Sequence, residues 1–565
     1  MHKPLPVGVD NFEKLVTRGY YFIDKTLFIQ ELLDKKTDVN LFTRPRRFGK
    51  TLNMSMLQYF FEDARDYEGK KQDHGYLFDG LKIMNTGEEY LSHMGKYPVI
   101  NLTLKGAKQP DFKLAYTMLV RQIANEFLRH KYILESKRLV DIKEKYLRIM
   151  QEKAEPAEYV DALQFLSRCL EQYYDKKTII LIDEYDVPLE NAYMRGFYQQ
   201  MLDFIRSLFE SALKTNSSLE FAVITGCLRI SKESIFTGMN NLNVISILNK
   251  QYSEYFGFTD EEVQRLCGDY ELPHKFEVFK NWYNGYLFGN TKVYNPWSVI
   301  LLMYDLCEDE NTYPMAYWAN TSSNSIVRKL IDMADQNAKK EIEALLRGET
   351  IKKPIHEDIT YEEVYQSMDN LWNFMFFTGY FRKVRDWMDD YDRYWMELCI
   401  PNREVRYIFN TKILTWFDEY VKTFDRSKLI SGLLRLDEET FQSELTKALW
   451  GTISFYDQYE SFYHGFLAGM LAGIEEYLVK SNREAGEGRS DLSIVPMYNF
   501  GPAYVLEFKI AGEITQLDEK ADEALKQIEE KGYAKELAAD GFEKVHRYGI
   551  AFCGKRCVVK LQKAD

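Results

Sequence analysis

Short apolar runs alternate with longer amphipathic stretches through the first half of the chain. Runs with the character of buried strands end at or span 41–43, 97–104, 178–183 and 220–225. Stretches with helical spacing of apolar residues are 51–61, 111–127, 139–152, 157–174 and 199–214. Strands that alternate with helices predict a parallel sheet with crossover connections, so an α/β domain is expected over residues 1–250.

The pattern becomes mainly helical after residue 250. Helices are predicted at 260–267, 276–282 and 297–304, and Asn295-Pro296 supplies the N-cap and first position of the third. Residues 371–412 then predict a helix, a hairpin with a polar tip at 386–393, and another helix. Residues 251–450 are therefore expected to form a helical lid and a winged-helix-like connector, with a simple spacer as the open alternative.

The last part of the chain carries a second α/β pattern, expected over residues 451–565. An apolar helical stripe over 459–478 is followed by a strand at 477–481 and a glycine-rich turn at 483–488. The remaining predicted elements are strands at 489–495 and 503–510, a helix at 517–531 and a strand at 547–552.

The turn that follows the first strand carries the residues Gly49-Lys50-Thr51. Such a strand-to-helix turn points backbone N–H groups at phosphate oxygens, lysine reaches the β- and γ-phosphates, and the threonine hydroxyl ligates Mg²⁺. The first glycine of the usual phosphate-loop pattern would fall at Arg44, so the match is incomplete. An ordinary capped helix start with a basic turn is the alternative.

The apolar run TIILIDEYD ends in two carboxylates and decides between these alternatives. Asp183, at the end of a buried strand, is placed to be the Mg²⁺ partner, and Glu184 to activate the attacking water. Thr225 ends a further strand and can sense the γ-phosphate, while Arg229, or an arginine among 44, 46 and 47, can stabilise transition-state charge. The predicted ATP-binding residues are Arg46, Arg47, Phe48, Gly49, Lys50, Thr51, Leu52, Asp183, Thr225 and Arg229, with Thr51 and Asp183 as metal ligands.

Composition narrows the class of protein. No apolar stretch approaches the roughly 20 residues of a membrane span, and the N-terminus has no signal-peptide core, so a cytoplasmic protein without membrane contact is expected. The seven cysteines form no CxxC pair, which argues against a zinc site or a disulfide framework. The net charge of −13 excludes a globally basic surface, so nucleic acid would have to contact local basic patches.

Residues 4 to about 300 resemble the AAA-ATPase-like family of bacterial proteins. The matching motifs are RPRRFGKT, LIDEYD, the ITG strand end and FGNTKVYNPWSVI. This family shares the missing first glycine, so the resemblance supports ATP binding. It also implies that an extra strand separates the two motif strands of the sheet.

Asp491, Glu507 and Lys509 stand out in the C-terminal pattern. Glu507 and Lys509 lie two residues apart on one strand, so their side chains emerge on the same face. A lysine beside two carboxylates is either a salt-bridged strand face or a metal-assisted phosphodiesterase site, and the spacing alone leaves both open.

This region resembles the PD-(D/E)XK nuclease fold, and specifically the nuclease domain often fused to AAA-ATPase-like proteins. The stretches SNREAGEGRSDLSIVP and YVLEFKI carry the likeness. The resemblance implies that Asp491 and Glu507 bind Mg²⁺ and that Lys509 positions the nucleophilic water. His464, Glu484 and Gln527 are second-tier candidates, Gln527 because ALKQIEEKGY resembles the glutamine helix of the RecB-like branch.

The combined prediction is an α/β P-loop ATPase joined by a connector to a restriction-endonuclease-like domain, acting as an ATP-regulated, Mg²⁺-dependent DNA nuclease. Glu184, Asp491, Glu507 and Lys509 are its predicted catalytic residues. One alternative is a nucleotide-dependent switch whose C-terminal domain binds nucleic acid or protein without cleavage, and another is an ATPase motor with a structural tail. Residues 250–450 are the expected moving element, and the interpretation leaves room for a homo-oligomer.

Overall fold

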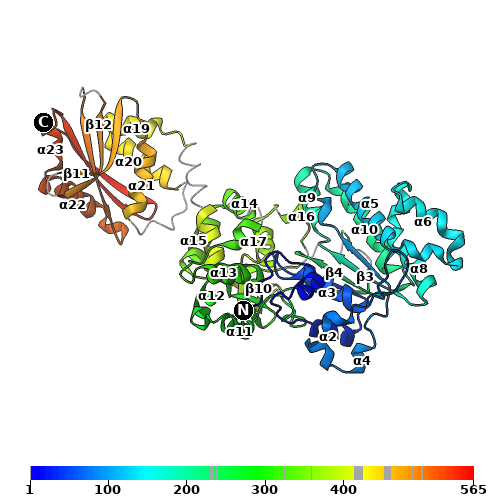
Figure 1. Cartoon of the computed structure of the whole chain (residues 1–565). Helices are drawn as coiled ribbons and strands as arrows, with labels where there is room; N and C mark the ends of the chain where they lie inside the picture. The colour runs from blue at the N-terminus through cyan, green and yellow to red at the C-terminus, as the bar shows by residue number, and fades with distance from the viewer. Residues whose placement is uncertain are drawn as a thin grey trace. The chain divides into compact units, whose positions relative to one another are not determined.

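The structure is a computed structural model of the chain, and it forms two compact units. One unit contains Met1–Ile326 and Thr350–Ile408, and the other contains Val327–Glu349 and Phe409–Asp565 (Figure 1). The described residues are 2–228, 235–236, 239–321, 325–357, 359–364, 366–412, 424–450, 460–485, 488–497 and 501–564. Among the helices in these ranges, none is both long and apolar enough to cross a membrane.

A five-stranded parallel sheet forms the centre of the first unit. Its strands, in spatial order, are β2 (Val99–Thr103), β3 (Thr178–Asp183), β4 (Leu219–Gly226), β1 (Val39–Thr43) and β5 (Leu242–Ile245). All residues of β1 and β3 are buried, as their continuous apolar runs predict. Strand β4 separates the two motif strands β1 and β3, so the prediction of an intervening strand is confirmed.

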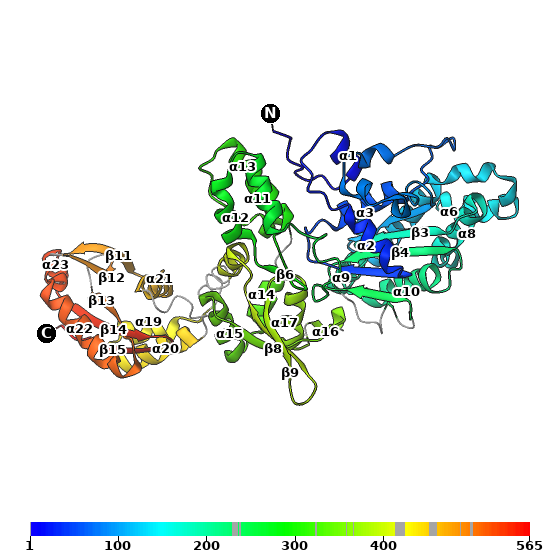
Figure 2. The ribbon, with the colours of Figure 1, turned by 90° about the horizontal axis from the view of Figure 1, so that it is seen from below.

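Helices surround this sheet, and all of those given below except α9 lie at positions that the apolar spacing predicts. Figures 1 and 2 show them around the strands. They are α3 (Lys50–Phe61), α5 (Phe112–Arg129), α6 (Lys143–Met150), α7 (Pro156–Val160), α8 (Ala162–Tyr174), α9 (Val187–Arg195) and α10 (Tyr198–Phe209). The predicted helix at 157–174 is broken into α7 and α8 because Asp161 departs from helical geometry between them.

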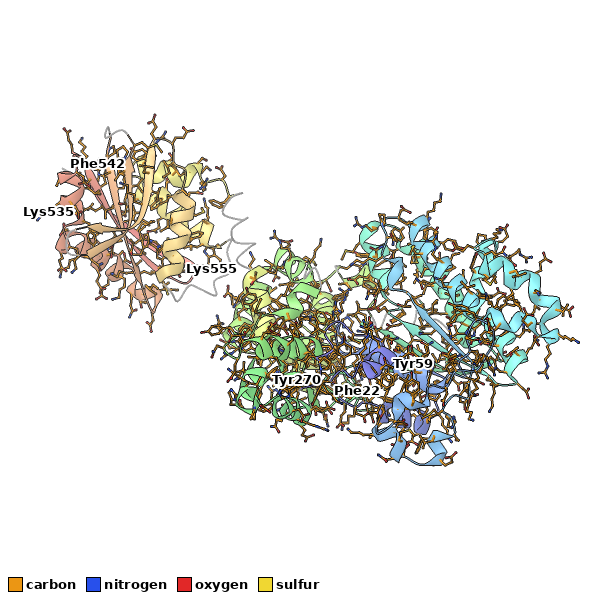
Figure 3. All side chains as sticks on the ribbon, in the orientation of Figure 1. Phe22, Tyr59, Tyr270, Lys535, Phe542 and Lys555 are labelled. Carbon is orange, nitrogen blue, oxygen red and sulfur yellow. The ribbon has the colours of Figure 1, made fainter. Side chains whose placement is uncertain are left out.

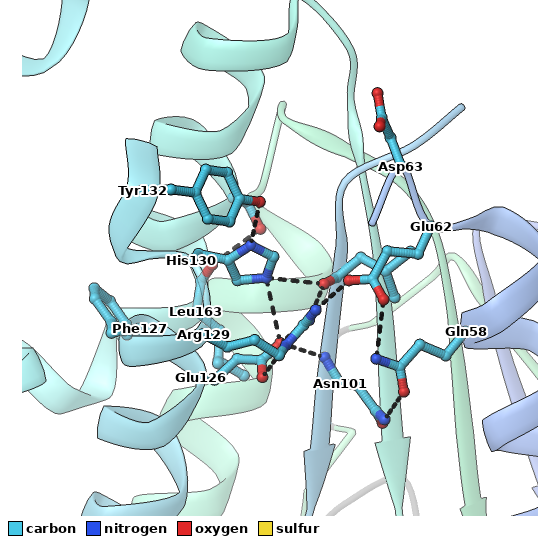
Figure 4. Close-up of polar contacts among 12 residues, drawn as sticks. Gln58, Glu62, Asp63, Asn101, Glu126, Phe127, Arg129, His130, Tyr132 and Leu163 are labelled. Carbon is cyan, nitrogen blue, oxygen red and sulfur yellow. Dashed lines mark hydrogen bonds and ion pairs between the residues drawn. The ribbon is translucent and has the colours of Figure 1, made fainter. Parts of the chain in front are cut away.

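A network of charged side chains ties the far end of α3 to β2 and α5 (Figure 4). Arg129 bonds to the carboxylates of Glu62 and Glu126 and donates to the Val99 carbonyl at 2.5 Å. Glu126 also accepts the Asn101 N–H at 2.8 Å. Although burial alone would raise it, the Arg129 guanidinium lowers the pKa of Glu126 to about 2. The helix that follows the phosphate loop is therefore anchored at both ends.

The rest of the first unit contains the predicted lid helices and a small sheet. The elements are α11 (Asp260–Asp269), α12 (Phe276–Tyr283), β6 (Tyr286–Phe288), β7 (Thr291–Val293), α13 (Pro296–Glu308), β8 (Ile351–Pro354), α16 (Tyr361–Val364), α17 (Met368–Phe377), β9 (Arg382–Met388) and β10 (Tyr394–Cys399). The order β8-β10-β9, with two helices between β8 and β9, is winged-helix connectivity. However, the stretch Leu371–Phe377 of α17 is buried, so most of this helix serves as core and only its first turn is at the surface.

The second unit is built on a five-stranded mixed sheet whose strands follow chain order. They are β11 (Tyr477–Ala485), β12 (Gly488–Pro496), β13 (Ala503–Ile510), β14 (Val545–Cys553) and β15 (Arg556–Gln562). Only β13 and β14 pair in parallel, and they are joined through α22 (Leu517–Glu530) and α23 (Tyr533–Ala539). Helices α19 (Ser427–Leu434), α20 (Glu438–Trp450) and α21 (Glu460–Leu471) complete its core.

One predicted turn is shorter than the sequence suggests. The pairs Glu484–Arg489 and Ala485–Gly488 extend the β11–β12 ladder into the stretch predicted as turn. Two long antiparallel strands satisfy their backbone groups against each other, which outweighs the local turn preference of the glycines.

Candidate functional sites

The phosphate-loop turn joins β1 to α3. Gly49 is the N-cap of α3 and has a left-handed φ of 81°, and Arg47 has a φ of 71°. The first helical hydrogen bond runs from the Asn53 N–H to the Gly49 carbonyl at 3.0 Å. The amides of the first turn of α3 are therefore at the open end of a helix, where an anion is favoured.

Lys50 folds back onto the loop that precedes it. Its Nζ donates to the carbonyls of Arg44 and Pro45, both at 2.9 Å, and lies 3.6 Å from the Cys227 Sγ. The residue is 7% exposed. The ammonium is thus held against two carbonyls of the loop, and Lys50 also lines the cavity described below.

Thr51, Asp183 and Thr225 come together at the carboxyl edge of the sheet. The Thr51 hydroxyl donates to Asp183 Oδ2 at 2.7 Å, and the Thr225 hydroxyl donates to Asp183 Oδ1. These hydroxyl and carboxylate oxygens are the hard donors that suit Mg²⁺. Residues from three separate parts of the chain therefore form one oxygen cluster, which fits the metal that a nucleoside triphosphate carries.

Glu184 directly follows this cluster and has a strained backbone, with a φ of 53°. Burial, together with the negative charge of Asp183, raises the pKa of its carboxyl above the ordinary value. Glu184 also lines the cavity described below. A carboxylate with a raised pKa beside a phosphate site has the properties of a general base.

A cavity of about 600 Å³ lies in front of the loop. Its polar lining includes Lys50, Thr51 and Glu184. Its apolar lining includes Val7 and Phe22 (labelled in Figure 3) from the N-terminal segment, Phe258, and Trp297 and Leu301 from α13. A lining with both polar and apolar residues suits a nucleotide, which has charged phosphates and a flat base.

The other predicted loop residues occupy distinct environments. Arg46 pairs with Glu190 at 2.5 Å, and the Arg47 guanidinium lies 4.3 Å above the Trp297 ring. Phe48 is fully buried, and Leu52 lines the cavity. Arg229 lies outside the described residues.

Arg44 does not face the nucleotide cavity. It is fully buried, donates to the Thr43 and Ile245 carbonyls, and has its guanidinium 5.1 Å from the rings of both Phe256 and Phe288. Burial lowers its pKa to about 9. The side chain that replaces the usual first glycine therefore fastens the loop to β5, a role that the sequence did not indicate.

The predicted residues of the second unit also meet. The β12–β13 ladder reaches Leu492–Leu506, and beyond it Asp491 Oδ2 accepts the Phe508 N–H at 2.8 Å. Lys509 Nζ lies 3.7 Å from Glu507 Oε1. The two carboxylates and the lysine thus gather where β12 and β13 separate.

Burial distinguishes this cluster from a salt-bridged surface. The Glu507 side chain is 2% exposed, whereas that of Lys509 is 25% exposed. A buried carboxylate is costly unless it is paired or binds a metal, so its position needs more than a surface ion pair to account for it. The oxygen donors of Asp491 and Glu507 fit Mg²⁺.

Neighbouring residues hold the cluster in place. Gln527 Nε2 donates to Glu507 Oε1, and the Nε2–H of His464 donates to the Asp491 backbone carbonyl at 2.8 Å. The side chain of Glu484 lies outside the described part of the structure. Tyr533 was not predicted, yet burial and the charges of Glu507 and Asp491 raise its pKa, and it bonds to Gln527. Tyr533 is the last residue of the stretch ALKQIEEKGY, so the resemblance that pointed to Gln527 was the available sequence signal.

Comparison with known proteins finds a match at each end of the chain. Residues 6–236 match the family described as predicted AAA-ATPase, and residues 458–562 match the PD-(D/E)XK nuclease superfamily. An uncharacterized protein in the vnfD 5′ region of Azotobacter chroococcum mcd 1 is 26% identical over 569 residues, which cover 97% of this chain and 96% of the relative. Both resemblances are confirmed: the chain has an AAA-ATPase-like domain at its N-terminal end and a PD-(D/E)XK superfamily domain at its C-terminal end.

Proposed function

We propose that this protein binds and hydrolyses ATP and that its C-terminal domain is a Mg²⁺-dependent nuclease acting on DNA. The observation that carries the proposal is the convergence of Thr51, Asp183 and Thr225 beside a cavity that is lined by both polar and apolar residues. The family matches of the two domains support it.

In the ATPase, Lys50 and the first amides of α3 bind the β- and γ-phosphates. Thr51 and Asp183 would hold Mg²⁺, and Glu184 takes the proton of the attacking water. The apolar lining residues receive the adenine, which Phe22 and Trp297 border. Arg46 and Arg47 supply positive charge near the phosphates.

In the nuclease, Asp491 and Glu507 would hold Mg²⁺, which would supply Lewis acidity and an activated water. Lys509 donates to the attacking water and stabilises the charge that develops on the phosphodiester. Gln527 fixes the orientation of Glu507 through its side-chain amide. His464 fixes the Asp491 backbone.

Two lysine substitutions separate the activities. Lys50→Ala is expected to weaken nucleotide binding by about 100-fold or more, because it removes the cation at the phosphates. Lys509→Ala is expected to abolish DNA cleavage and to leave ATP binding intact. Lys214→Ala and Lys526→Ala, at surface ion pairs of the same two domains, serve as controls. The wild-type protein is tested on single-stranded, double-stranded and branched DNA, with Mg²⁺ or Mn²⁺ and with or without ATP. Absence of cleavage under all of these conditions would favour the non-cleaving switch.

We further propose that ATP controls the nuclease through residues 250–450. A ligand shifts a conformational equilibrium only by its differential affinity for the two states, so this segment must differ between them. Limited proteolysis with and without ATP tests the idea, with mapping of the cuts by mass spectrometry. Identical cutting within 250–450 under both conditions would contradict control through this segment.

A further inference from the structure

The two residues after Glu184 wrap around the end of β4. Tyr185 donates its N–H to the Thr225 carbonyl at 3.0 Å and its hydroxyl to the Leu228 carbonyl at 2.6 Å. Asp186 Oδ2 accepts the N–H groups of Cys227 at 2.8 Å and Leu228 at 3.2 Å. Four hydrogen bonds therefore fasten residues 225–228 to the turn that follows β3.

This arrangement is buried and closely packed. Tyr185 is 0% exposed and Asp186 is 3% exposed. A Cβ added at Gly226 would lie 2.4 Å from Tyr185 Cε1 and 2.9 Å from Asp186 Oδ1, so only glycine fits there. The glycine of the ITG strand end is thus explained by the approach of these two side chains.

The fastened segment carries two contacts of the ATP site. Thr225 bonds to Asp183, and Cys227 Sγ lies 3.6 Å from Lys50 Nζ. Asp186 itself is not among the described residues that line the cavity. Its carboxylate is joined to the site by the hydrogen bonds that it accepts from Cys227 and Leu228, and its charge also acts on Lys50 and Arg46.

We infer that Asp186 is a positioning residue for ATP hydrolysis: by binding the Cys227 and Leu228 amides, it holds Thr225 against Asp183 at the reacting edge of the sheet. The inference rests on the proposed ATPase activity. A side chain at position 186 that still accepts these two hydrogen bonds keeps Thr225 in place. An apolar side chain of similar size cannot accept them and leaves residues 225–228 less firmly held.

Asp186→Leu and Asp186→Asn form the test, with Asp203→Asn on the exposed face of α10 as control. We expect Asp186→Leu to lower kcat for ATP about tenfold or more while nucleotide Kd stays within about threefold. Asp186→Asn keeps most of the activity because its carbonyl oxygen accepts both amides. In nucleotide-free protein, amide hydrogen exchange of the peptide that contains residues 225–228 should be faster in Asp186→Leu than in the wild type. Asp186→Asn and the control variant should exchange at the wild-type rate in this peptide.

The outcomes are distinguishable. Absence of ATP turnover in the wild type overturns the proposed ATPase and this inference with it. Wild-type turnover with unchanged kcat in Asp186→Leu overturns the positioning role alone, as does an equal loss of kcat and nucleotide affinity. If Asp186→Leu does not fold, Asp186→Ala decides, because it removes the same acceptor without adding a larger apolar group and should lower kcat about tenfold at unchanged Kd.

Discussion

The N-terminal candidate site draws on residues between 46 and 225, whereas the C-terminal one comes from residues 464 to 533. In the first, the carboxyl ends of parallel strands bring together side chains that are far apart in the chain. In the second, neighbouring strands and the next helix supply the cluster. A parallel sheet therefore builds a site from distant motifs, and the mixed sheet builds one from adjacent motifs.

The two sites also hold their central carboxylates differently. Asp183 accepts two threonine hydroxyls, while Glu507 accepts an amide and lies beside an ammonium group. The threonine hydroxyls beside Asp183 are uncharged and can rotate so that their oxygens face a metal ion. The positive charge of Lys509, in contrast, already neutralises part of the negative charge that would attract a metal ion to the second site. We therefore expect the second site to depend more on substrate phosphates for metal binding.

Removal of a carboxylate in the second site gives the largest expected effect. Glu507→Gln and Asp491→Asn keep size and hydrogen-bond acceptors but lose charge, so Mg²⁺-dependent cleavage should fall by about 10³-fold or more. Gel assays of a labelled DNA substrate measure this, with Asp522→Asn on the α22 surface as control. Cleavage at the parent rate in either variant would remove the assignment of the metal ligands.

Glu184→Gln tests the first site with the next largest effect. The amide cannot accept a proton, so ATP turnover should fall about 10²- to 10³-fold while nucleotide affinity is retained. Steady-state phosphate release and equilibrium binding of a fluorescent nucleotide give the two readouts. Glu210→Gln, at an exposed ion pair, is the control. Parent-rate turnover in Glu184→Gln would mean that another group activates the water.

Arg129→Met probes how far the first site depends on distant support. It leaves Glu62 and Glu126 buried without their guanidinium, so we expect the first unit to lose about 3–5 kcal/mol of stability. Arg121 lies on the same helix as Arg129 and forms an exposed ion pair with Glu152. Arg121→Met breaks this pair and should cost about 1 kcal/mol of stability or less. Denaturant unfolding followed by tryptophan fluorescence compares them, and equal losses would show that the network adds no stability.

Glu404 gives the smallest expected effect, a pH dependence confined to the first unit. It is fully buried, accepts the Ser298 hydroxyl at 2.8 Å and the Trp318 N–H at 2.8 Å, and burial raises its pKa to about 7. The pKa of Glu404 is higher in the folded protein than in the unfolded chain. Its protonated form therefore contributes stability that is fully present below the unfolded pKa and is lost as pH rises through about 7. This loss amounts to about 3 kcal/mol at most.

The substitution Glu404→Gln removes this titration. Relative to the variant, the wild type should lose unfolding free energy between about pH 5 and pH 8, measured by denaturant unfolding of the first unit at several pH values. The melting transition of the second unit in the same samples is the internal control. A stability difference that is the same at pH 5 and pH 8 would contradict the assignment to Glu404.

Sequence reasoning found the residues whose position follows from local structure. Gly49 and Lys50 start a helix after a strand, Asp183 ends a buried strand, and Glu507 and Lys509 share a strand face. Each of these placements depends only on the period of one element. The extra strand between β1 and β3 came from the family resemblance, since no local pattern specifies strand order.

The residues that were missed depend on contacts between distant elements. Arg44 has an ordinary surface-turn context in sequence, but the rings that receive it come from more than 200 residues later. Likewise, winged-helix connectivity was predicted, while the burial of α17 was not. An apolar face in the sequence predicts that one side of a helix is covered. Whether the opposite side is covered as well depends on tertiary packing.

The bonds from Lys50 to the Arg44 and Pro45 carbonyls have a consequence for affinity. The loop acts as an internal competitor for its own lysine, so nucleotide binding is an exchange of partners in which two carbonyl bonds break as phosphate contacts form. The net gain per exchanged hydrogen bond is small. We therefore expect Lys50 to contribute less to nucleotide affinity than an ammonium group that has no partner in the empty site.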